Sequence, residues 1–231
     1  MNSGHVVPVI TVDGPSGVGK GTVSRGLAEK LGWQRLDSGA LYRILALAAV
    51  DAGIALSDTD AVAALAPNLD IRFTGSHEDN EAIWVNGVNV KDRVRAETTG
   101  GLASQIAAAP AVRAALLQRQ KDFRVAPGLI GDGRDMGTVV FPDAGLKLFL
   151  TASAEERARR RLRQLSAAGQ TAILADLCTE ISTRDERDRT RSVAPLVPAS
   201  DAILIDTTLL NPTQVAERID DLLKDRGFLR S

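Results

Sequence analysis

The segment GPSGVGKGT, at residues 14–22, is the part of this chain best suited to bind a phosphate. It follows an apolar stretch at residues 6–12 that is typical of a strand, and it precedes a helix-forming segment at residues 23–31. The glycines allow backbone N–H groups to turn toward an anion, and the helix directs the positive end of its dipole to the same point. The lysine can reach the outer phosphates of a nucleoside triphosphate. We therefore predict a phosphate-binding loop made of Gly14, Pro15, Ser16, Gly17, Val18, Gly19, Lys20, Gly21 and Thr22.

The loop departs from the usual phosphate-loop pattern directly after its lysine. That pattern has a Ser or Thr at this place, and its hydroxyl meets a magnesium ion. This chain has Gly21 there and carries the hydroxyl one residue later, at Thr22. We therefore expect Thr22 to serve the metal ion. The ending GKGT resembles that of the nucleoside monophosphate kinases more than that of GTPases or motor ATPases.

A second candidate anion site lies in the segment LDSGALYR, residues 36–43. Asp37 or Ser38 caps a helix that is predicted to run through residue 50, and the free N–H groups of its first turn suit an anion. Arg43, one turn into this helix, adds a guanidinium that suits a phosphate. The alternative is a capped helix that carries a solvated arginine. These residues alone leave both interpretations open.

A third cluster, GDGRDMGT at residues 131–138, follows a predicted buried strand. Asp132 lies where a phosphoryl-transfer enzyme places the acid that holds magnesium, here expected to act through the water shell of the ion. Arg134 and Asp135 come directly after it. The alternative is a surface ion pair in a turn, which contributes little. The flanking glycines and the place after a buried strand favour a functional site.

Nine arginines lie between residues 157 and 191 of a chain whose net charge is only −1. The first group, Arg157, Arg160 and Arg161, has the i, i+3, i+4 spacing of one helix face. After a connector at residues 166–170, a second group follows. We expect a two-helix arm that closes over the phosphates, because phosphoryl transfer requires several cations around the reacting groups.

The second group, Arg184, Asp188 and Arg191, has i, i+4, i+7 spacing and is again expected on one helix face. The alternative for both groups is a solvated helix face whose charges pair locally. The acids available for such pairs are Glu155, Glu156, Asp185 and Glu186.

The composition is that of an ordinary globular protein, with 44% hydrophobic and 25% charged residues over a length of 231. The net charge of −1 argues against bulk electrostatic binding to nucleic acid or to an anionic membrane. The single cysteine, Cys178, excludes an internal disulfide and a thiolate zinc cluster, and we interpret it as a packing residue. No signal-peptide or membrane-helix pattern is present, so we expect a cytoplasmic protein.

Strands and helices are predicted to alternate along most of the chain. Predicted strands at residues 33–36, 129–132, 147–150 and 202–205 join the first strand, and the last three of them are expected to be buried. Helical patterns follow the strands at residues 33–36, 147–150 and 202–205. This order implies a parallel sheet with helices on both faces, whose ligands collect at the carboxyl ends of the strands. Residues 70–74, 82–85 and 88–90 instead predict a local antiparallel sheet, with Asn86 and Gly87 as its hairpin turn. Further helices are predicted at residues 58–66, 97–108 and 110–123, and the last helix is expected to open at Asn211 and Pro212.

The chain resembles the bacterial cytidylate kinase family along nearly its whole length. The resemblance rests on motifs that occur in the order and spacing of the family. They are GPSGVGKGT (14–22), LDSGALYR (36–43), ASQIA (103–107), DGRDMGTVVFPD (132–143) and the run from Arg184 to Leu196. The first motif is shared by many kinases, whereas the second, fourth and fifth together are specific to this family.

The resemblance implies an α/β, three-layer P-loop kinase fold with a central parallel sheet, a small antiparallel insert and a short helical lid. It implies one domain, 1–231, with the insert at about 68–108 and the lid at about 155–192, and a transfer of phosphate from ATP, with Mg²⁺, to CMP or dCMP. The catalytic residues would be Lys20, Arg134, Arg157 and Arg191, and Arg157 would also contact ATP. The substrate-binding residues would be Ser38, Tyr42, Arg43, Ser104, Arg113, Arg134, Asp135, Arg184, Asp188 and Arg191. Thr22 and Asp132 would serve the metal ion.

The proposed base-reading residues complement cytosine. Its exocyclic amine is a donor, and its ring nitrogen and carbonyl are acceptors, which suits Asp135 beside Arg113 and Ser104. Uracil would set a carbonyl against the carboxylate. We expect a monomer that binds small-molecule nucleotides, without nucleic-acid or membrane partners.

Two alternatives remain for the function. The first is a kinase that phosphorylates UMP or a small hydroxylated metabolite. The second is a nucleotide switch that hydrolyses a triphosphate to change partners, although the Asn-Lys-x-Asp element of guanine-specific switches does not occur in this sequence.

Overall fold

The computed structural model describes residues 6–74, 81–167 and 169–229, and the chain divides into two compact units. The first unit comprises residues 1–35 and 124–231, and the second comprises residues 36–123. Residues 75–80, which lie between two predicted strands of the insert, and Ala168 of the predicted connector lie outside the described residues.

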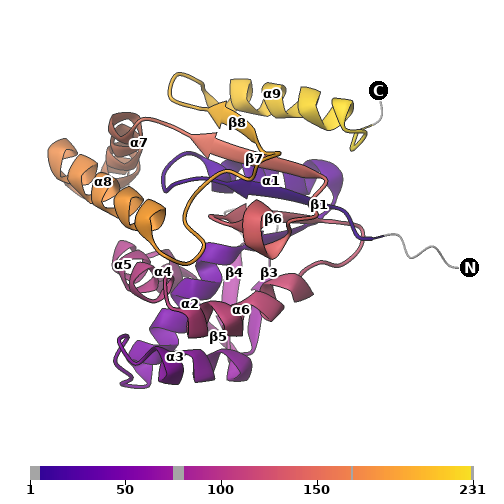
Figure 1. Ribbon diagram of the computed structural model, residues 1–231. Coiled ribbons are helices and arrows are strands. Elements are labelled where there is room, and N and C mark those ends of the chain that lie inside the picture. The colour runs from indigo at the N-terminus through magenta and orange to yellow at the C-terminus, as the bar shows by residue number, and fades with distance from the viewer. Residues whose placement is uncertain (1–5, 75–80, 168, 230–231) are drawn as a thin grey trace, which may run out of the picture. The chain divides into compact units, whose positions relative to one another are not determined.

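A five-stranded sheet forms the centre of the fold, in the order β2–β6–β1–β7–β8 (Figure 1). The strands are β1 (Val9–Asp13), β2 (Gln34–Asp37), β6 (Leu129–Gly133), β7 (Leu146–Thr151) and β8 (Ile203–Asp206). β1 pairs in parallel with both β6 and β7, and β7 pairs in parallel with β8. Neighbours that are far apart in the sequence require crossover connections, which helices provide. The predicted central parallel sheet is therefore confirmed.

The helices of the first unit are α1 (Lys20–Leu31), α7 (Ala154–Ala167), α8 (Leu174–Thr190) and α9 (Pro212–Asp225), together with the π-helical turn η2 (Met136–Val140). α9 begins as its sequence predicts: Asn211 caps it in a capping box with Gln214, and Pro212 is its first residue. α7 and α8 pack against each other as a pair (Figure 1). Among the described residues, no helix combines the length and hydropathy that crossing a membrane requires.

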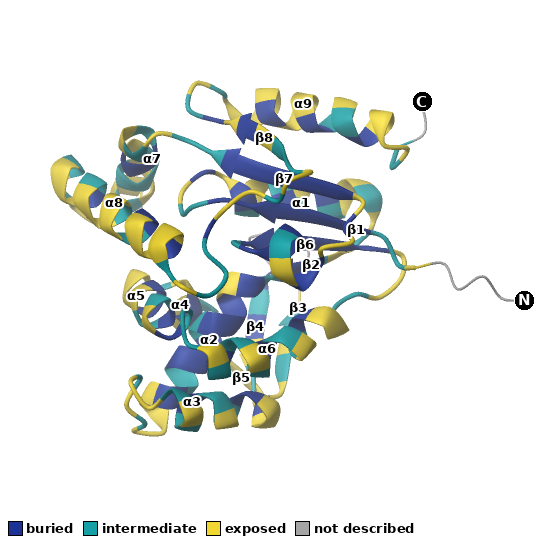
Figure 2. Cartoon of the chain, in the orientation of Figure 1, coloured by how far each residue is buried: buried dark blue, intermediate teal, exposed yellow. Residues whose placement is uncertain are grey.

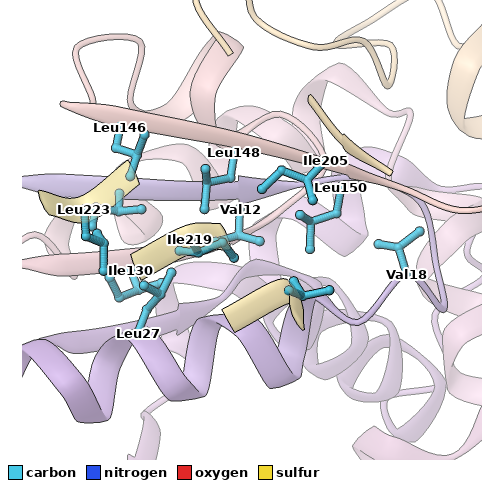
Figure 3. Packing of buried hydrophobic residues seen from close by; sticks show 12 residues of the cluster. Val12, Val18, Leu27, Ile130, Leu146, Leu148, Leu150, Ile205, Ile219 and Leu223 are labelled. Atoms are coloured by element: carbon cyan, nitrogen blue, oxygen red, sulfur yellow. The ribbon is translucent and has the colours of Figure 1, made fainter. Parts of the chain in front are cut away.

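Apolar side chains from β1, β6, β7, β8, α1 and α9 form one core, seen from close by in Figure 3. Ile10 and Val12 of β1 are fully buried there, and Leu27 of α1 and Ile219 of α9 pack into the same cluster. Figure 2 shows β1 and β7 buried along most of their length. This core gives the loops at the carboxyl ends of β1, β6 and β7 a rigid support, because close-packed interiors deform little.

The prediction of a buried strand at residues 202–205 was wrong. β8 lies at the edge of the sheet, and Leu204 in it is 56% exposed. An edge strand has a neighbour on one side only, so an apolar run does not by itself guarantee burial there.

The second unit contains a three-stranded antiparallel sheet of β3 (Ile71–Thr74), β4 (Ala82–Val85) and β5 (Val88–Asn89). Asn86 and Gly87 form its turn with positive φ values of 50° and 80°, as a two-residue hairpin of this sequence requires. The helices of this unit are α2 (Ser38–Asp51), α3 (Thr59–Leu65), the 3₁₀ turn η1 (Ala66–Asn68), α4 (Lys91–Arg95), α5 (Glu97–Ile106) and α6 (Pro110–Asp122).

α4 was not predicted from the sequence. It has only five residues, which is too short for a helical period to show, and no glycine or proline separates it from α5. The boundary is Ala96, whose extended ψ of 142° interrupts the helix.

Candidate functional site

The glycine-rich loop follows β1 directly, as predicted. Gly14 has a φ of 145°, and a Cβ on this residue would lie 2.2 Å from the carbonyl oxygen of Leu150, so only glycine fits there. Gly19 precedes α1 with a φ of 97° and provides no side-chain cap to the helix. The first turn of α1 contains no acidic residue. A loop of this form, ahead of a helix N-terminus, suits an anion, and its role in phosphate binding stays a prediction.

Two polar side chains hold the shape of this loop. Nζ of Lys20 donates to the carbonyl oxygen of Pro15 at 2.7 Å, and only 8% of Lys20 is exposed. The Thr207 hydroxyl, directly after β8, lies within hydrogen-bond distance of the carbonyl oxygens of Val18 (3.2 Å) and Thr151 (3.1 Å), either of which can accept its one proton. Thr207 is 2% exposed and was missed by the sequence analysis, because its partners are distant in the chain.

Asp132 lies near the end of β6 and is 7% exposed. Its Oδ2 accepts a hydrogen bond from the hydroxyl of Ser24, which is fully buried in α1, at 3.1 Å. Thr22 is exposed. Over the ranges that the structure describes, no group of three or more His, Cys, Asp or Glu side chains could hold a metal ion by itself. A magnesium ion would therefore depend on waters and substrate oxygens as well, as is usual for this ion.

Asp13, the last residue of β1, is a polar residue that the sequence analysis did not single out. Its two carboxylate oxygens accept the N–H groups of Met136 (2.9 Å) and Gly137 (2.8 Å). Burial raises the pKa of Asp13 to about 7; the charge of Asp135 also raises it, while the two N–H groups and Lys20 lower it. Asp13 thus fixes the start of η2 next to Asp135. The sequence signal that could have pointed to Asp13 is its place at the end of an apolar strand, directly before Gly14.

Arg134 and Asp135 directly follow β6. Nε of Arg134 donates to Oδ2 of Asp188 in α8 at 3.0 Å. Asp135 is only 5% exposed. The alternative of a surface ion pair in a turn is therefore wrong, because a solvated pair would leave both side chains in water.

Arg157 lies beneath the loop instead of on an open helix face. Its side chain is 4% exposed, and it forms a two-point ion pair with Asp185 of α8. It also donates to the carbonyl oxygens of Ser16 and Ala152, each at 3.1 Å. One guanidinium thus joins the phosphate-loop candidate to α7 and α8.

The other arginines of α7 and α8 are of two kinds. Some reach distant parts of the chain, and others form only local pairs at the surface. Arg160 reaches the Thr207 carbonyl and hydroxyl and also pairs with Glu156. Exposed local pairs form between Arg159 and Glu155, Arg163 and Glu156, and Arg189 and Glu186. The two helices α7 and α8 are present as predicted, but some of their arginines lie on a solvated helix face and pair locally.

The prediction that Arg191 shares a helix face with Arg184 and Asp188 was wrong. α8 ends at Thr190, and Arg191 has an extended ψ of 138°. The chain then turns back, so that the Leu196 N–H donates to the carbonyl of Asp188 at 2.8 Å and Nε of Arg191 donates to the carbonyl of Ala194. Arg184 and Asp188 remain four residues apart on α8.

In the second unit, Asp37 and not Ser38 caps α2, since its Oδ1 accepts the Ala40 N–H at 3.0 Å. Ser38 is the first residue of this helix and is 5% exposed, and Tyr42 is 9% exposed. Arg43 is not a solvated arginine: its NH1 donates to the carbonyls of Val94 (2.8 Å) and Ala96 (3.2 Å).

Ser104 lies on α5 and Arg113 on α6, and both are half-buried. NH1 of Arg113 donates to the carbonyl of Ala107 at 3.3 Å. The residues assigned to the acceptor nucleotide are thus distributed over both units of the chain.

Comparison with known proteins identifies the family. The family model described as cytidylate kinase matches residues 10–225. The chain belongs to the cytidylate kinase family. The matched range includes every residue named above for the site, from the phosphate-loop candidate to Arg191. The resemblance stated from the motifs is therefore confirmed.

Relatives in this family cover nearly the whole chain. A cytidylate kinase of Stutzerimonas stutzeri strain A1501 is 58% identical over 223 residues, which cover 96% of this chain and 97% of the relative. A cytidylate kinase of Pseudomonas putida strain W619 is 56% identical over 230 residues, which cover 99% of this chain and 100% of the relative. Among solved structures, a gluconokinase of Sinorhizobium meliloti 1021 aligns over 96% of this chain and 97% of its own, with a TM-score of 0.43 and 15% identity.

Proposed function

We propose that this chain transfers the γ-phosphoryl group of ATP to CMP or dCMP, giving ADP and CDP or dCDP. The observation that carries this function is its membership of the cytidylate kinase family over residues 10–225. The chemistry of the site residues supports it, because a phosphate loop, several arginines and a buried base-reading acid are the parts that such a reaction needs.

ATP is the donor, and its phosphates bind residues 14–22. Lys20 neutralises charge on the outer phosphates, which stabilises the transition state more than the ground state. Arg157 holds the loop in shape through its bond to the Ser16 carbonyl, and it thereby positions the loop for catalysis. A direct contact between Arg157 and ATP is a further part of the proposal.

CMP binds through three groups of residues. Its phosphate meets the N-terminal turn of α2 at Ser38, together with the guanidinium groups of Arg43, Arg134 and Arg191. Its ribose meets Arg184 and Asp188. Its cytosine amine donates to Asp135, while Ser104 and Arg113 donate to the ring acceptors. Tyr42 is the remaining residue that we assign to CMP binding.

A magnesium ion fits the oxygen donors near the loop. Asp132 offers a buried carboxylate that already accepts the Ser24 hydroxyl, and Thr22 offers an exposed hydroxyl on α1. These are hard oxygen ligands, which Mg²⁺ prefers, and too few to displace its water shell. When bound, the ion would neutralise charge on the transferring phosphoryl group.

The acceptor phosphate is itself the nucleophile, so no general base is assigned. The residues act by positioning the two nucleotides, neutralising charge and excluding water. We assign the insert to about residues 68–108 and the lid to about residues 155–192, the latter comprising α7 and α8. We expect the enzyme to act as a monomer on small-molecule nucleotides.

Transfer to four acceptors tests the function. Purified protein with Mg-ATP is assayed with CMP, dCMP, UMP and AMP side by side, together with the variant Asp135→Asn. We expect kcat/KM for CMP and dCMP to exceed that for UMP by about 100-fold or more, because uracil leaves a carbonyl against a buried carboxylate. The variant should reduce this ratio. Equal or better turnover of UMP would contradict the role of Asp135, and no transfer to CMP would contradict the function.

A further inference from the structure

Arg95, the last residue of α4, bridges two carboxylates of the second unit. Its NH1 donates to Oδ2 of Asp37 at 2.8 Å, and its NH2 lies 3.1 and 3.0 Å from the two carboxylate oxygens of Glu81. The Asp37 side chain is 17% exposed and that of Glu81 only 7%. Partly buried charges of this kind interact strongly because little water screens them.

Asp37 connects this bridge to the N-terminus of α2. One carboxylate oxygen accepts the Ala40 N–H and caps the helix, while the other accepts from Arg95. The bridge therefore holds the cap in one orientation. The capped turn begins with Ser38 and is the turn proposed above to receive the acceptor phosphate.

Arg95 is also the residue between Val94 and Ala96 in the sequence, whose backbone carbonyls hold Arg43. The carbonyl oxygens of Val94 and Ala96 both accept from NH1 of Arg43, at 2.8 and 3.2 Å. They can converge on one nitrogen because Ala96 leaves the helical conformation directly after Arg95. The pairs with Asp37 and Glu81 thus anchor the bend on which the Arg43 guanidinium rests.

We infer that Arg95 is a positioning residue for the acceptor phosphate of the proposed reaction. It orients the first turn of α2 through Asp37 and supports Arg43 through the backbone at residues 94–96. It also offsets two negative charges that would otherwise oppose an arriving phosphate at this helix end. This inference rests on the proposed function and adds to it a residue that contacts no substrate.

The test compares variants of Arg95 with a matched control on the same helix. Arg95→Ala should raise KM for CMP by about tenfold or more, because Asp37 and the buried Glu81 lose the guanidinium that bridges them. KM for ATP should stay within about twofold, since the donor loop belongs to the other unit. Arg95→Lys should recover part of the loss, because an ammonium keeps the charge but not the two-sided geometry.

The control is Arg93→Ala. Arg93 pairs with Asp51 at 2.6 Å, but both side chains are about half exposed. Such a surface pair contributes little, so KM for CMP should change by less than about twofold. Thermal melting of each variant reports whether it is folded.

Glu81→Gln provides a second route should Arg95→Ala fail to fold. It keeps the volume of the side chain and removes only its charge, and KM for CMP should again rise while KM for ATP does not. An unchanged KM for CMP in a folded Arg95→Ala or in Glu81→Gln, or an equal rise for both substrates, overturns the inference. A wild-type protein that does not phosphorylate CMP contradicts the proposed function instead.

Discussion

Arg134 and Asp188 are 54 positions apart and bond directly, with 3.0 Å between Nε of the arginine and Oδ2 of the aspartate. The arginine follows β6, and the aspartate lies in the last turns of α8, whose end is closed by the Leu196 N–H on the Asp188 carbonyl. Asp188 thus orients Arg134, a residue proposed to bind phosphate, through its side chain. Through its backbone carbonyl it also holds the segment that follows α8. The position of Arg134, which we propose contacts the acceptor phosphate, therefore depends on α8.

Asp188→Ala should weaken the binding of CMP more than that of ATP. It removes a proposed ribose contact and the partner of Arg134, and loss of a charged hydrogen bond weakens binding by about ten- to a hundredfold. Titration calorimetry with each nucleotide measures both affinities. Asp188→Asn, which keeps an acceptor oxygen, should lose less. A larger loss for ATP than for CMP would show that the acceptor site is misplaced.

Arg157→Ala should destabilise the fold. The variant leaves Asp185 as a buried charge without its partner, and such a loss costs about 3–5 kcal/mol. The free energy of unfolding, from urea titration, measures this loss. Arg159→Ala is the control on the same helix, because its pair with Glu155 is exposed and is expected to contribute less than about 1 kcal/mol.

The double variant of Arg157 and Asp185 should lose less stability than the two single variants together, because the second change removes the charge that the first left unpaired. A loss below about 1 kcal/mol for Arg157→Ala would contradict a structural role for this pair.

Lys20→Met should lower kcat by about a hundredfold or more, because it removes a positive charge from the developing charge on the transferring phosphoryl group. The rate of CDP formation measures this effect, and thermal melting checks the fold. Lys30→Met is the control: Lys30 lies in the same helix, and its ion pair with Asp220 is exposed. A near-normal rate in Lys20→Met would remove this residue from the proposed mechanism.

Asp13 should make stability depend on pH. Burial raises its pKa from 3.8 to about 7, so between these values the folded chain holds a proton that the unfolded chain has released. Stability therefore falls as the pH rises from about 4 to about 7, by about 1.4 kcal/mol per pH unit.

Comparison with Asp13→Asn isolates this effect, because other carboxylates titrate in both proteins. The free energy of unfolding of the wild type minus that of the variant should be larger at about pH 5 than at about pH 8, by about 3 kcal/mol. A difference that is constant over this range, or that grows with pH, would refute an Asp13 that is neutral in the folded chain at low pH.

Local patterns predicted most of the elements. The apolar run before Gly14, the turn at Asn86 and Gly87 and the opening of α9 at Pro212 each depend on residues within a few positions of one another. Their conformational preferences act before any distant contact forms. The same patterns misplaced Arg191, because an i, i+7 spacing continues past the residue at which the helix ends.

The sequence alone was sufficient to place the chain among the cytidylate kinases, because the motifs that identify the family are short and follow one another in order. The residues that these motifs assign to the phosphates and the base stay a proposal. Only the tertiary structure revealed which partner each charged side chain takes: Asp13 with the N–H groups of η2, Arg157 with Asp185 and Ser16, and Arg95 with Asp37 and Glu81. Most of these partners lie tens to more than a hundred residues apart. Their bonds and their burial exist only once the elements pack, and no local preference encodes them.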